Sequence, residues 1–329
     1  MNSPVDHIRR VYDAVDGRAG APFAKGELVI ERAFARAFLE WIAVEKAPSP
    51  ATPEDSLLAC CRHLNLDLIC LHAEEVRKHC PGPIEIGRYI GRFVEQRLFV
   101  FWVVNGPYQT ASRRMGFDDF HMNCADHPEA VFAKMSEISG DILREVAFGV
   151  KSGAHGIMIA EDIAHARGLL VSPRFVKTFL MPLWMEQVKT ARHLNVPVFF
   201  HSDGNIDSLL PLITAAGFDG LQCIEPGASM PIGKVKSTYG KKRCLMGNLD
   251  PSLLIDRPEP ENEKGDYRRL SETVRSLIPE ASPGGRFIFG TCSGLYEGLS
   301  PERVFFMHRL ADEFNSGRSA QVARDEILI

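Results

Sequence analysis

The sequence predicts an α/β protein in which residues 1–329 form a single (β/α)8 barrel domain, a TIM barrel, with an N-terminal helical extension. Eight short apolar runs alternate with longer amphipathic segments, and this alternation of strand and helix indicates a parallel sheet. The runs are apolar throughout rather than at every second residue, which is typical of strands that helices cover. An open doubly wound sheet is the main alternative, although no Gly-x-Gly-x-x-Gly motif follows the first run.

Eight candidate strands follow one another along the chain: Glu27–Ile30, Asp67–Leu71, Leu98–Val104, Gly156–Ala160, Val196–Phe200, Gly220–Ile224, Arg243–Met246 and Arg286–Phe289. The first of these runs gives the weakest strand signal. Two further segments, Ala47–Pro53 and the charged, proline-bearing Asp256–Gly265, are predicted to be loops.

Two helices between the strands are predicted in more detail. Apolar residues recur every three or four positions in Pro128–Val150, which predicts a helix with one buried face. Asp126 and Glu129 are spaced as the capping box of this helix. Ser172-Pro173 has the residue types of an N-cap and a first helical position, and the helix that follows is expected to end near Leu194.

The composition is that of an ordinary globular protein, with 45% hydrophobic and 24% charged residues. A net charge of −4, without a Lys/Arg cluster, argues against nucleic-acid binding. No apolar run is long enough to span a bilayer, and the N-terminus lacks the apolar stretch of a secretory signal. The eight cysteines form no Cys-x-x-Cys pair, so we expect a cytoplasmic protein with reduced thiols.

Polar residues follow five of the predicted strands directly: Glu161 and Asp162, His201 and Asp203, Glu225, Asn248 and Asp250, and Thr291 and Cys292. In a parallel barrel the carboxyl ends of all strands meet at one mouth, where catalytic groups of such enzymes lie. The sequence therefore predicts a site assembled from residues that are far apart along the chain.

His201 and Asp203 are two residues apart, so both would point the same way from an extended segment. Together they could bind a metal ion or form an acid–base pair. Asp203 could instead cap the next helix, and His201 could be a hydrogen-bonded core residue. Cys292 lies beyond its strand, where a thiol could ligate zinc, act as a nucleophile, or simply occupy a tight turn.

Three further charged residues are candidates for the same mouth. Of the neighbours Glu161 and Asp162, one is expected to fix the loop by hydrogen bonding while the other faces the pocket. Arg113, after the Gly106-Pro107-Tyr108 turn, could bind an anionic substrate, or it could belong to a solvated basic surface.

Five segments of the chain are GPYQTASRRMGFDDF, IMIAEDIAHARGLLVSPRFVKTFLMPLW, VPVFFHSDGNIDSLLPLITAAGFDGLQCIEP, VKSTYGKKRCLMGNLDP and GGRFIFGTCSGL followed by SPERV. In their order and spacing they resemble the uroporphyrinogen decarboxylase superfamily, which includes heme-pathway decarboxylases and cobamide-dependent methyltransferases. The five segments extend from about Leu98 to Phe306, about two-thirds of the chain. The resemblance implies a (β/α)8 barrel with its site at the mouth.

Decarboxylases of this superfamily resemble one another in an arginine-rich N-terminal segment that grips substrate carboxylates, and this chain has no such segment near Pro22–Glu31. Where they carry an essential Asp after the second strand, the chain has Leu71-His72-Ala73-Glu74, so Glu74 is the matching carboxylate. Their later Gly-His-Gly is replaced by Thr291-Cys292-Ser293-Gly294. A substrate with eight carboxylates would be poorly paired in such a pocket.

The methyltransferase branch holds zinc through a His-x-Cys motif after one strand and a further Cys after the last. His201 and Cys292 match the outer two ligands, and Asp203 replaces the middle Cys, so the resemblance implies a His/Asp/Cys zinc site. Asn248 and Asp162 would contact the substrate, and Glu161 or Glu225 would position the acceptor or take its proton. The methyl donor would be methylcobalamin on a separate corrinoid protein, and the acceptor a thiol, a pterin or another small nucleophile.

The sequence leaves three functional hypotheses open. The first is zinc-assisted methyl transfer between a corrinoid protein and a small acceptor. The second is a metal-free carboxy-lyase in which Glu74, Arg113 and His201 bind the substrate and protonate the product. The third is a degenerate barrel that acts as a binding module, which would require that the mouth residues fail to converge in space.

Overall fold

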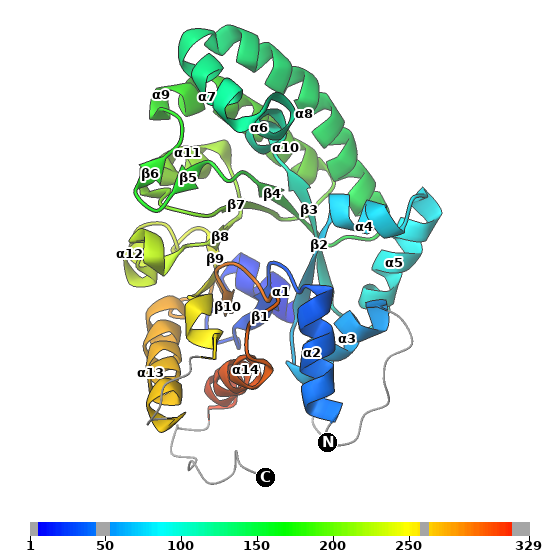
Figure 1. Ribbon diagram of the computed structural model, residues 1–329, viewed down its shortest axis with the longest axis vertical. Coiled ribbons are helices and arrows are strands. Elements are labelled where there is room, and N and C mark those ends of the chain that lie inside the picture. The colour runs from blue at the N-terminus through cyan, green and yellow to red at the C-terminus, as the bar shows by residue number, and fades with distance from the viewer. Residues whose placement is uncertain (1–5, 44–52, 257–262, 318–329) are drawn as a thin grey trace.

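The computed structural model of the protein describes residues 6–43, 53–256 and 263–317. Across these ranges eight parallel strands close into a barrel in the order β1-β10-β9-β8-β7-β4-β3-β2 (Figure 1). The strands are β1 (Ala24–Glu27), β2 (Leu68–His72), β3 (Phe99–Asn105), β4 (Gly156–Ala160), β7 (Val198–Ser202), β8 (Gly220–Cys223), β9 (Cys244–Leu249) and β10 (Phe287–Thr291). A short antiparallel pair, β5 (Ala164–His165) and β6 (Gly168–Leu169), follows β4. The predicted (β/α)8 barrel is confirmed.

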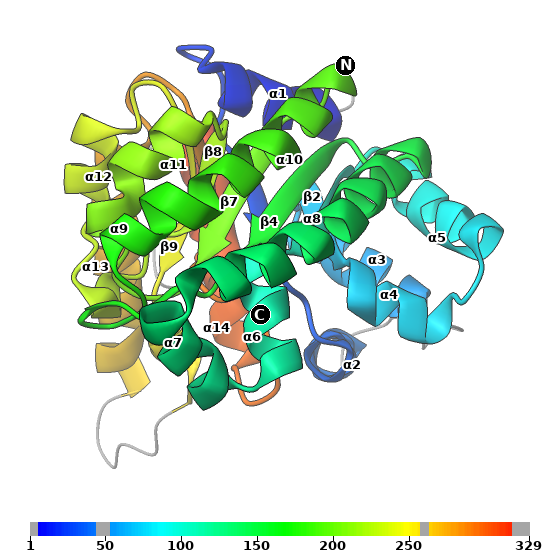
Figure 2. The same cartoon turned by 90° about the horizontal axis from the view of Figure 1, so that it is seen from above.

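Helices surround the strands, as the two views of Figures 1 and 2 show. They are α1 (His7–Asp16), α2 (Arg32–Ala43), α3 (Pro53–His63), α4 (Ala73–His79), α5 (Pro83–Glu95), α6 (Pro107–Met115), α7 (Phe117–Asp126), α8 (Pro128–Lys151), α9 (Pro173–Phe175), α10 (Met181–His193), α11 (Leu210–Ala216), α12 (Ile232–Thr238), α13 (Glu263–Ala281) and α14 (Pro301–Asn315). A π turn, η1 (Val176–Leu180), joins α9 to α10, and three 3-10 turns are η2 (Asp207–Leu209), η3 (Pro226–Ala228) and η4 (Pro251–Leu254).

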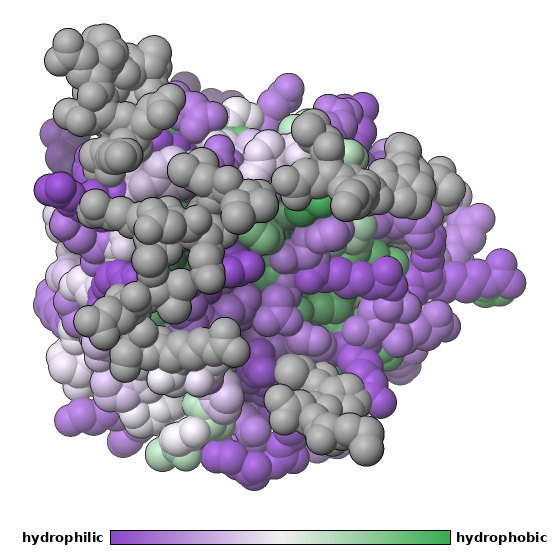
Figure 3. All heavy atoms as spheres, turned by 90° about the horizontal axis from the view of Figure 1, so that it is seen from below, coloured by the Kyte–Doolittle hydropathy of each residue, from purple (hydrophilic) through white to green (hydrophobic). Residues whose placement is uncertain are grey.

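One face of the molecule is mostly polar where its residues are described. On the face drawn in Figure 3, hydrophilic side chains predominate among the coloured atoms, and hydrophobic ones show mainly near its centre. Within the described ranges, none of the helices combines the length and the apolar character needed to cross a bilayer.

The first strand was predicted three residues too late: β1 is Ala24–Glu27 and not Glu27–Ile30. The error arises because two charged side chains, Lys25 and Glu27, are buried on the outer side of this strand. Lys25 pairs with Asp312 at 2.8 Å, and Glu27 accepts a hydrogen bond from the Thr291 hydroxyl at 2.5 Å. Buried charges that are paired in this way cannot be recognised from an apolar pattern.

The structure also corrects the predicted helix ends. The Asp126–Glu129 capping box is wrong, because Asp126 ends α7 and the N-cap of α8 is His127, whose side chain makes no capping bond. Ser172 is an N-cap as predicted, since its hydroxyl accepts the Phe175 N–H at 3.1 Å.

The two predicted loops lie partly outside the described residues. Of Ala47–Pro53, residues 47–52 are outside them, and Pro53 begins α3. Of Asp256–Gly265, residues 257–262 are outside them, and residues 263–265 are helical rather than loop because α13 begins at Glu263. The loop prediction is therefore wrong for the last three residues of that segment.

Side chains that point into the barrel form an apolar layer over most of its height. The layer comprises Ala24, Leu28, Leu68, Cys70, Phe99, Phe101, Val103, Met158, Ala160, Phe199, Cys244, Met246 and Ile288. Helix α1 packs against this layer through Val11, Ala14 and Val15 and contacts the strands, so it covers one end of the barrel. Because alternate residues of a strand face inward, the same pattern brings polar residues inward at the strands' carboxyl ends.

A buried carboxylate holds α1 in this place. Asp67 accepts hydrogen bonds from His7 Nδ1 at 2.7 Å, from Arg10 Nη1 at 3.1 Å and from the Lys25 backbone N–H at 2.8 Å. Its side chain has no exposed surface, so these three donors compensate the cost of burying it. Asp67 therefore links the N-terminal helix to strand β1.

We predict that Asp67→Asn lowers the free energy of unfolding by roughly 2–4 kcal/mol, because it leaves Arg10 without its buried counter-charge. Asp141→Asn is the matched control, since Asp141 forms an exposed ion pair with Arg144 that contributes at most about 1 kcal/mol. Urea unfolding of both variants measures the difference. Equal, small losses would contradict the anchoring role of Asp67.

Candidate active site

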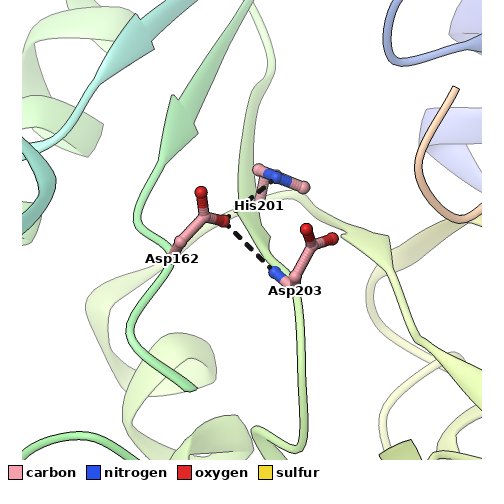
Figure 4. Close-up of side chains that lie close together, drawn as sticks. All are labelled: Asp162, His201 and Asp203. Carbon is pink, nitrogen blue, oxygen red and sulfur yellow. Dashed lines mark hydrogen bonds and ion pairs between the residues drawn. The ribbon is translucent and has the colours of Figure 1, made fainter. Parts of the chain in front are cut away.

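Three side chains converge at the carboxyl ends of β4 and β7. Asp162 comes from the segment after β4, His201 from β7 itself and Asp203 from the residue just beyond it (Figure 4). One ligand atom from each lies within 4.8 Å of the other two. His201 Nε2 is 3.3 Å from Asp162 Oδ1, and the same oxygen accepts the Asp203 backbone N–H at 3.3 Å. The structure thus brings together residues that sequence analysis placed at the mouth.

His201 is buried and its ring is oriented by Gln222. Gln222 Nε2 donates to the Cys292 carbonyl at 3.0 Å, so its Oε1 faces His201 Nδ1 at 2.5 Å. An oxygen there requires a proton on Nδ1, which leaves Nε2 to face Asp162 with a lone pair whenever the ring is neutral. Sequence analysis missed Gln222, although an amide in an otherwise apolar strand was a usable signal.

The pKa values of this pair reflect opposing effects. Burial lowers the pKa of His201, but the hydrogen bond and charge of Asp162, with Asp203 and Gln222, raise it more, so the net shift is upward. Burial raises the pKa of Asp162, but its interaction with His201 and the Asp203 N–H lowers it overall. Each group therefore favours the charged form of the other.

A second histidine lies at the same mouth. His72 ends β2, and its Nε2 is buried without a hydrogen-bond partner. Burial and the nearby His201 lower the pKa of His72, so its ring is held neutral. The sequence analysis named Glu74, two residues later, as a candidate but did not name His72. The position of His72 at the end of an apolar run could have identified it.

Glu161 is buried and acts on the backbone of α6. It accepts the N–H groups of Tyr108 at 3.3 Å and Gln109 at 2.8 Å, and the indole N–H of Trp184 at 2.8 Å. Gly106 leaves room for it, since a Cβ there would lie 2.2 Å from the Glu161 carboxyl carbon. Burial raises the pKa of Glu161 to about 7, although these hydrogen bonds act to lower it. Of the two neighbours, Glu161 fixes the loop and Asp162 faces the pocket.

Two other candidates hold loops. The Glu225 carboxylate accepts the Gly204 N–H at 2.8 Å, next to Asp203. The Asn248 amide is buried and donates to the Ile224 carbonyl. Both residues are at the mouth, but the bonds that they make are to backbone groups of the β7 and β8 loops.

Cys292 lies close to the three-residue cluster but is not part of it. Its carbonyl is joined to His201 through Gln222, whereas its thiol is not among the ligand atoms that lie within 4.8 Å of one another. The thiol instead lies within hydrogen-bonding reach of Cys223, whose own thiol donates to Asp203 Oδ1 at 3.3 Å. The neighbouring Cys292 and burial raise the pKa of Cys223 well above its ordinary value.

Glu74 and Arg113 lie further out. They form an ion pair at 3.2 Å in which the side chains are 63% and 57% exposed, so the pair contributes little to stability. Arg113 also lines a pocket of about 310 Å³ that reaches Asp162. The other lining residues are Tyr108, Gln109, Ser112, Gly116 and Phe117. Arg113 on α6 and Asp162, one member of the three-residue cluster, therefore line the same pocket.

This geometry can be compared with known proteins. The family model described as "Uroporphyrinogen decarboxylase (URO-D)" matches residues 71–314, which is most of the chain. The chain belongs to the uroporphyrinogen decarboxylase family. The match begins at the end of β2 and includes every strand end that contributes a residue to the cluster.

Relatives in the uroporphyrinogen decarboxylase family are distant. A uroporphyrinogen decarboxylase of Saccharophagus degradans is 24% identical over 195 residues, which is 58% of this chain and 50% of that protein. One of Pseudoalteromonas atlantica is 23% identical over 252 residues, 74% of this chain and 63% of that protein. The chain thus spans about half to less than two-thirds of the length of these curated relatives.

A solved structure titled "methyltransferase from Methanosarcina mazei" has a TM-score of 0.71 and 16% identity, and the alignment covers 94% of this chain and 99% of that one. At this identity the likeness establishes a shared fold. Membership of the superfamily, which was predicted from sequence motifs, is confirmed. This membership supports the prediction that the protein is an enzyme.

We predict that the pKa of Glu161 makes stability depend on pH. Its folded pKa of about 7 lies above its ordinary value of 4.5, so the folded state holds the proton more tightly. The free energy of unfolding of chelator-treated protein should therefore fall by up to about 3 kcal/mol as pH rises from 5 to 7. Glu161→Gln should lose most of this slope in urea unfolding series, whereas the exposed Glu186→Gln should keep it. Identical slopes in all three proteins would refute the prediction.

Proposed function

We propose that this member of the uroporphyrinogen decarboxylase family is a zinc-dependent methyltransferase that moves a methyl group between a corrinoid protein and a small acceptor. The observation that carries the proposal is the convergence of Asp162, His201 and Asp203 within 4.8 Å at the barrel mouth. An imidazole and two carboxylates are a donor set that zinc accepts, and three protein ligands leave one position open, as in catalytic zinc sites.

The separation of one pair of donor atoms matches that expected for this ion. Zinc with nitrogen and oxygen ligands at about 2.0–2.1 Å in tetrahedral geometry separates neighbouring ligand atoms by about 3.3 Å. His201 Nε2 and Asp162 Oδ1 are 3.3 Å apart. The hydrogen bond from His201 Nδ1 to Gln222 keeps Nε2 directed at the cluster, which is the usual outer-shell support for a ligating histidine.

When bound, zinc supplies a Lewis acid that lowers the pKa of a thiol or similar acceptor, so that its nucleophilic form exists near neutral pH. Asp162 and Asp203 supply the negative charge that compensates the ion, and His201 supplies the neutral ligand. Arg113, across the same pocket, is placed to attract an anionic group on the acceptor. The donor, methylcobalamin on a corrinoid partner, would meet the acceptor at the open mouth.

The solved methyltransferase of Methanosarcina mazei has the same fold, and this likeness supports methyl transfer as the reaction of this barrel. The alternative is a carboxy-lyase acting on a carboxylated substrate, which the names of the curated relatives favour. Arg113 is the one cationic side chain that lines the described pocket, and it is paired with Glu74. A substrate with many carboxylates would find few partners there, which favours methyl transfer.

We predict that His201→Ala and Asp203→Ala weaken zinc binding by at least about 100-fold, because each removes a direct ligand. Both variants should also abolish methyl transfer from free methylcobalamin to 2-mercaptoethanol. Asp207 lies four residues after Asp203 and forms an ion pair with Lys234. Asp207→Ala is therefore the matched control and should behave as wild type.

Zinc content and methyl transfer are measured on the same preparations, together with carbon dioxide release from uroporphyrinogen. Full methyl transfer by chelator-stripped wild type would overturn the metal-dependent mechanism. Release of carbon dioxide that persists in Asp203→Ala, without methyl transfer by wild type, would establish the lyase instead.

A further inference from the structure

His72 holds an unpartnered nitrogen at the barrel mouth. Leu68 and Cys70 of β2 belong to the inward apolar layer, so the alternation of the strand turns His72 inward as well, at the carboxyl end. Its Nε2 is buried and has no hydrogen-bond partner. A buried polar atom of this kind costs free energy, and a ligand that pairs with it during function is one explanation for its presence.

The other unpartnered atoms of the described residues lie elsewhere. Besides His72, buried side-chain nitrogen or oxygen atoms without a partner belong to Ser136, Ser139, Gln187, Arg243 and His308. The first three of these residues are on α8 and α10, Arg243 precedes β9, and His308 is on α14. Within the part of the chain that the structure describes, His72 is therefore the residue that places such an atom at the carboxyl end of a barrel strand.

The contacts of His72 determine which ring nitrogen carries the proton. Burial, the largest effect, lowers the pKa of His72, and the net shift is downward, so the ring is neutral. A hydrogen bond to the Leu28 backbone acts in the opposite direction, as expected when the ring donates to a carbonyl oxygen. Because Nε2 has no partner, this bond belongs to Nδ1. A neutral ring with its proton on Nδ1 presents a lone pair at Nε2.

His72 and His201 face the interior at the same rim. Strands β3 and β4 lie between β2 and β7 in the barrel. The inward residues that pair with the two histidines, Val103 beside His72 and Ala160 beside His201, carry short apolar side chains. His201 also lowers the pKa of His72, so the two rings lie within electrostatic reach of each other, although no hydrogen bond joins them.

The carboxylates at this rim are already engaged. Both oxygens of Glu161 accept N–H groups from the backbone of α6, and Glu225 accepts the Gly204 N–H. Asp162 and Asp203 are the proposed ligands of the ion. His72 Nε2 thus offers, among the described groups at the mouth, a lone pair that no other residue uses.

We propose that His72 Nε2 takes the proton that the methyl acceptor loses, an inference that rests on the proposed function. With a thiol as the acceptor, the S–H bond breaks, its electron pair stays on sulfur, and an N–H bond forms at Nε2. The proton returns to water when the methylated product leaves. The step needs no oxidant or reductant, and it makes His72 a catalytic residue.

The charges at the mouth favour this transfer. Asp162 and Asp203 compensate the charge of a divalent ion, so an acceptor that has lost its proton adds one negative charge without a counter-charge. A protonated His72 ring supplies that counter-charge inside the same partly buried site. Before the acceptor binds, burial keeps the ring neutral and its lone pair available. His72 therefore changes charge together with the acceptor.

The test measures proton release when 2-mercaptoethanol binds to the zinc-loaded full-length protein. Isothermal titration calorimetry near neutral pH, in buffers of different ionisation enthalpy, gives the number of protons that reach the buffer. We expect close to none for wild type and about one for His72→Asn, whose amide still donates to Leu28 but has no atom at the position of Nε2. His79→Asn is the matched control, because His79 is an exposed histidine at the end of α4, and it should behave as wild type.

Methyl transfer to thiols of different acidity gives a second readout. His72→Asn should slow transfer to 2-mercaptoethanol by at least about 100-fold. It should slow transfer to 2,2,2-trifluoroethanethiol much less, because this more acidic thiol loses its proton more readily. Zinc affinity should not change, since His72 is not among the clustered ligand atoms. If His72→Asn fails to fold by circular dichroism, His72→Gln takes its place.

Each outcome decides between the alternatives. Equal proton release by wild type and His72→Asn, or an equal loss of rate with both thiols, overturns the role of His72 but leaves the metal-dependent function standing. Loss of zinc binding in His72→Asn also overturns it, because the residue then serves the ion. Proton retention that needs His72, without methyl transfer by wild type, supports the inference and overturns the proposed reaction. Failure of wild type to bind zinc or 2-mercaptoethanol overturns both.

Discussion

Closure of eight parallel strands into one barrel is the constraint on which the rest of the structure depends. It forces the carboxyl ends of all strands to one rim, so that residues far apart along the chain become neighbours, such as Asp162 and His201 at 3.3 Å. The interior below the rim is filled by apolar side chains and covered at one end by α1. Polar groups that face inward can therefore meet only at the mouth.

At the mouth, a chain of hydrogen bonds orients the side chains of the cluster. The Cys292 carbonyl orients Gln222, Gln222 orients His201, and His201 Nε2 faces Asp162. Asp162 and Asp203 concentrate negative charge beside this imidazole, with the Cys223 thiol next to them. Such a set is costly when unpaired in a partly buried site, and a divalent cation would compensate it.

The sequence predicted the barrel well because apolar strands and amphipathic helices leave a periodic signal that does not need tertiary information. It misplaced β1, where Lys25 and Glu27 are buried and paired with residues far along the chain. It located the site at the strand ends for the same periodic reason. The sequence could not predict that the Cys223 thiol contacts Asp203. Cys223 has a left-handed φ, and the periodicity of apolar residues gives no information about such a backbone conformation.

The central claim is that one ion binds where Asp162, His201 and Asp203 converge. The most direct measurement is a crystal structure of the zinc-loaded protein with diffraction data collected on either side of the zinc absorption edge. The account predicts a single anomalous peak within about 2.0–2.3 Å of His201 Nε2 and of a carboxylate oxygen of each aspartate. A zinc peak elsewhere in the molecule, with this cluster still joined by the direct contact of His201 with Asp162, would contradict it.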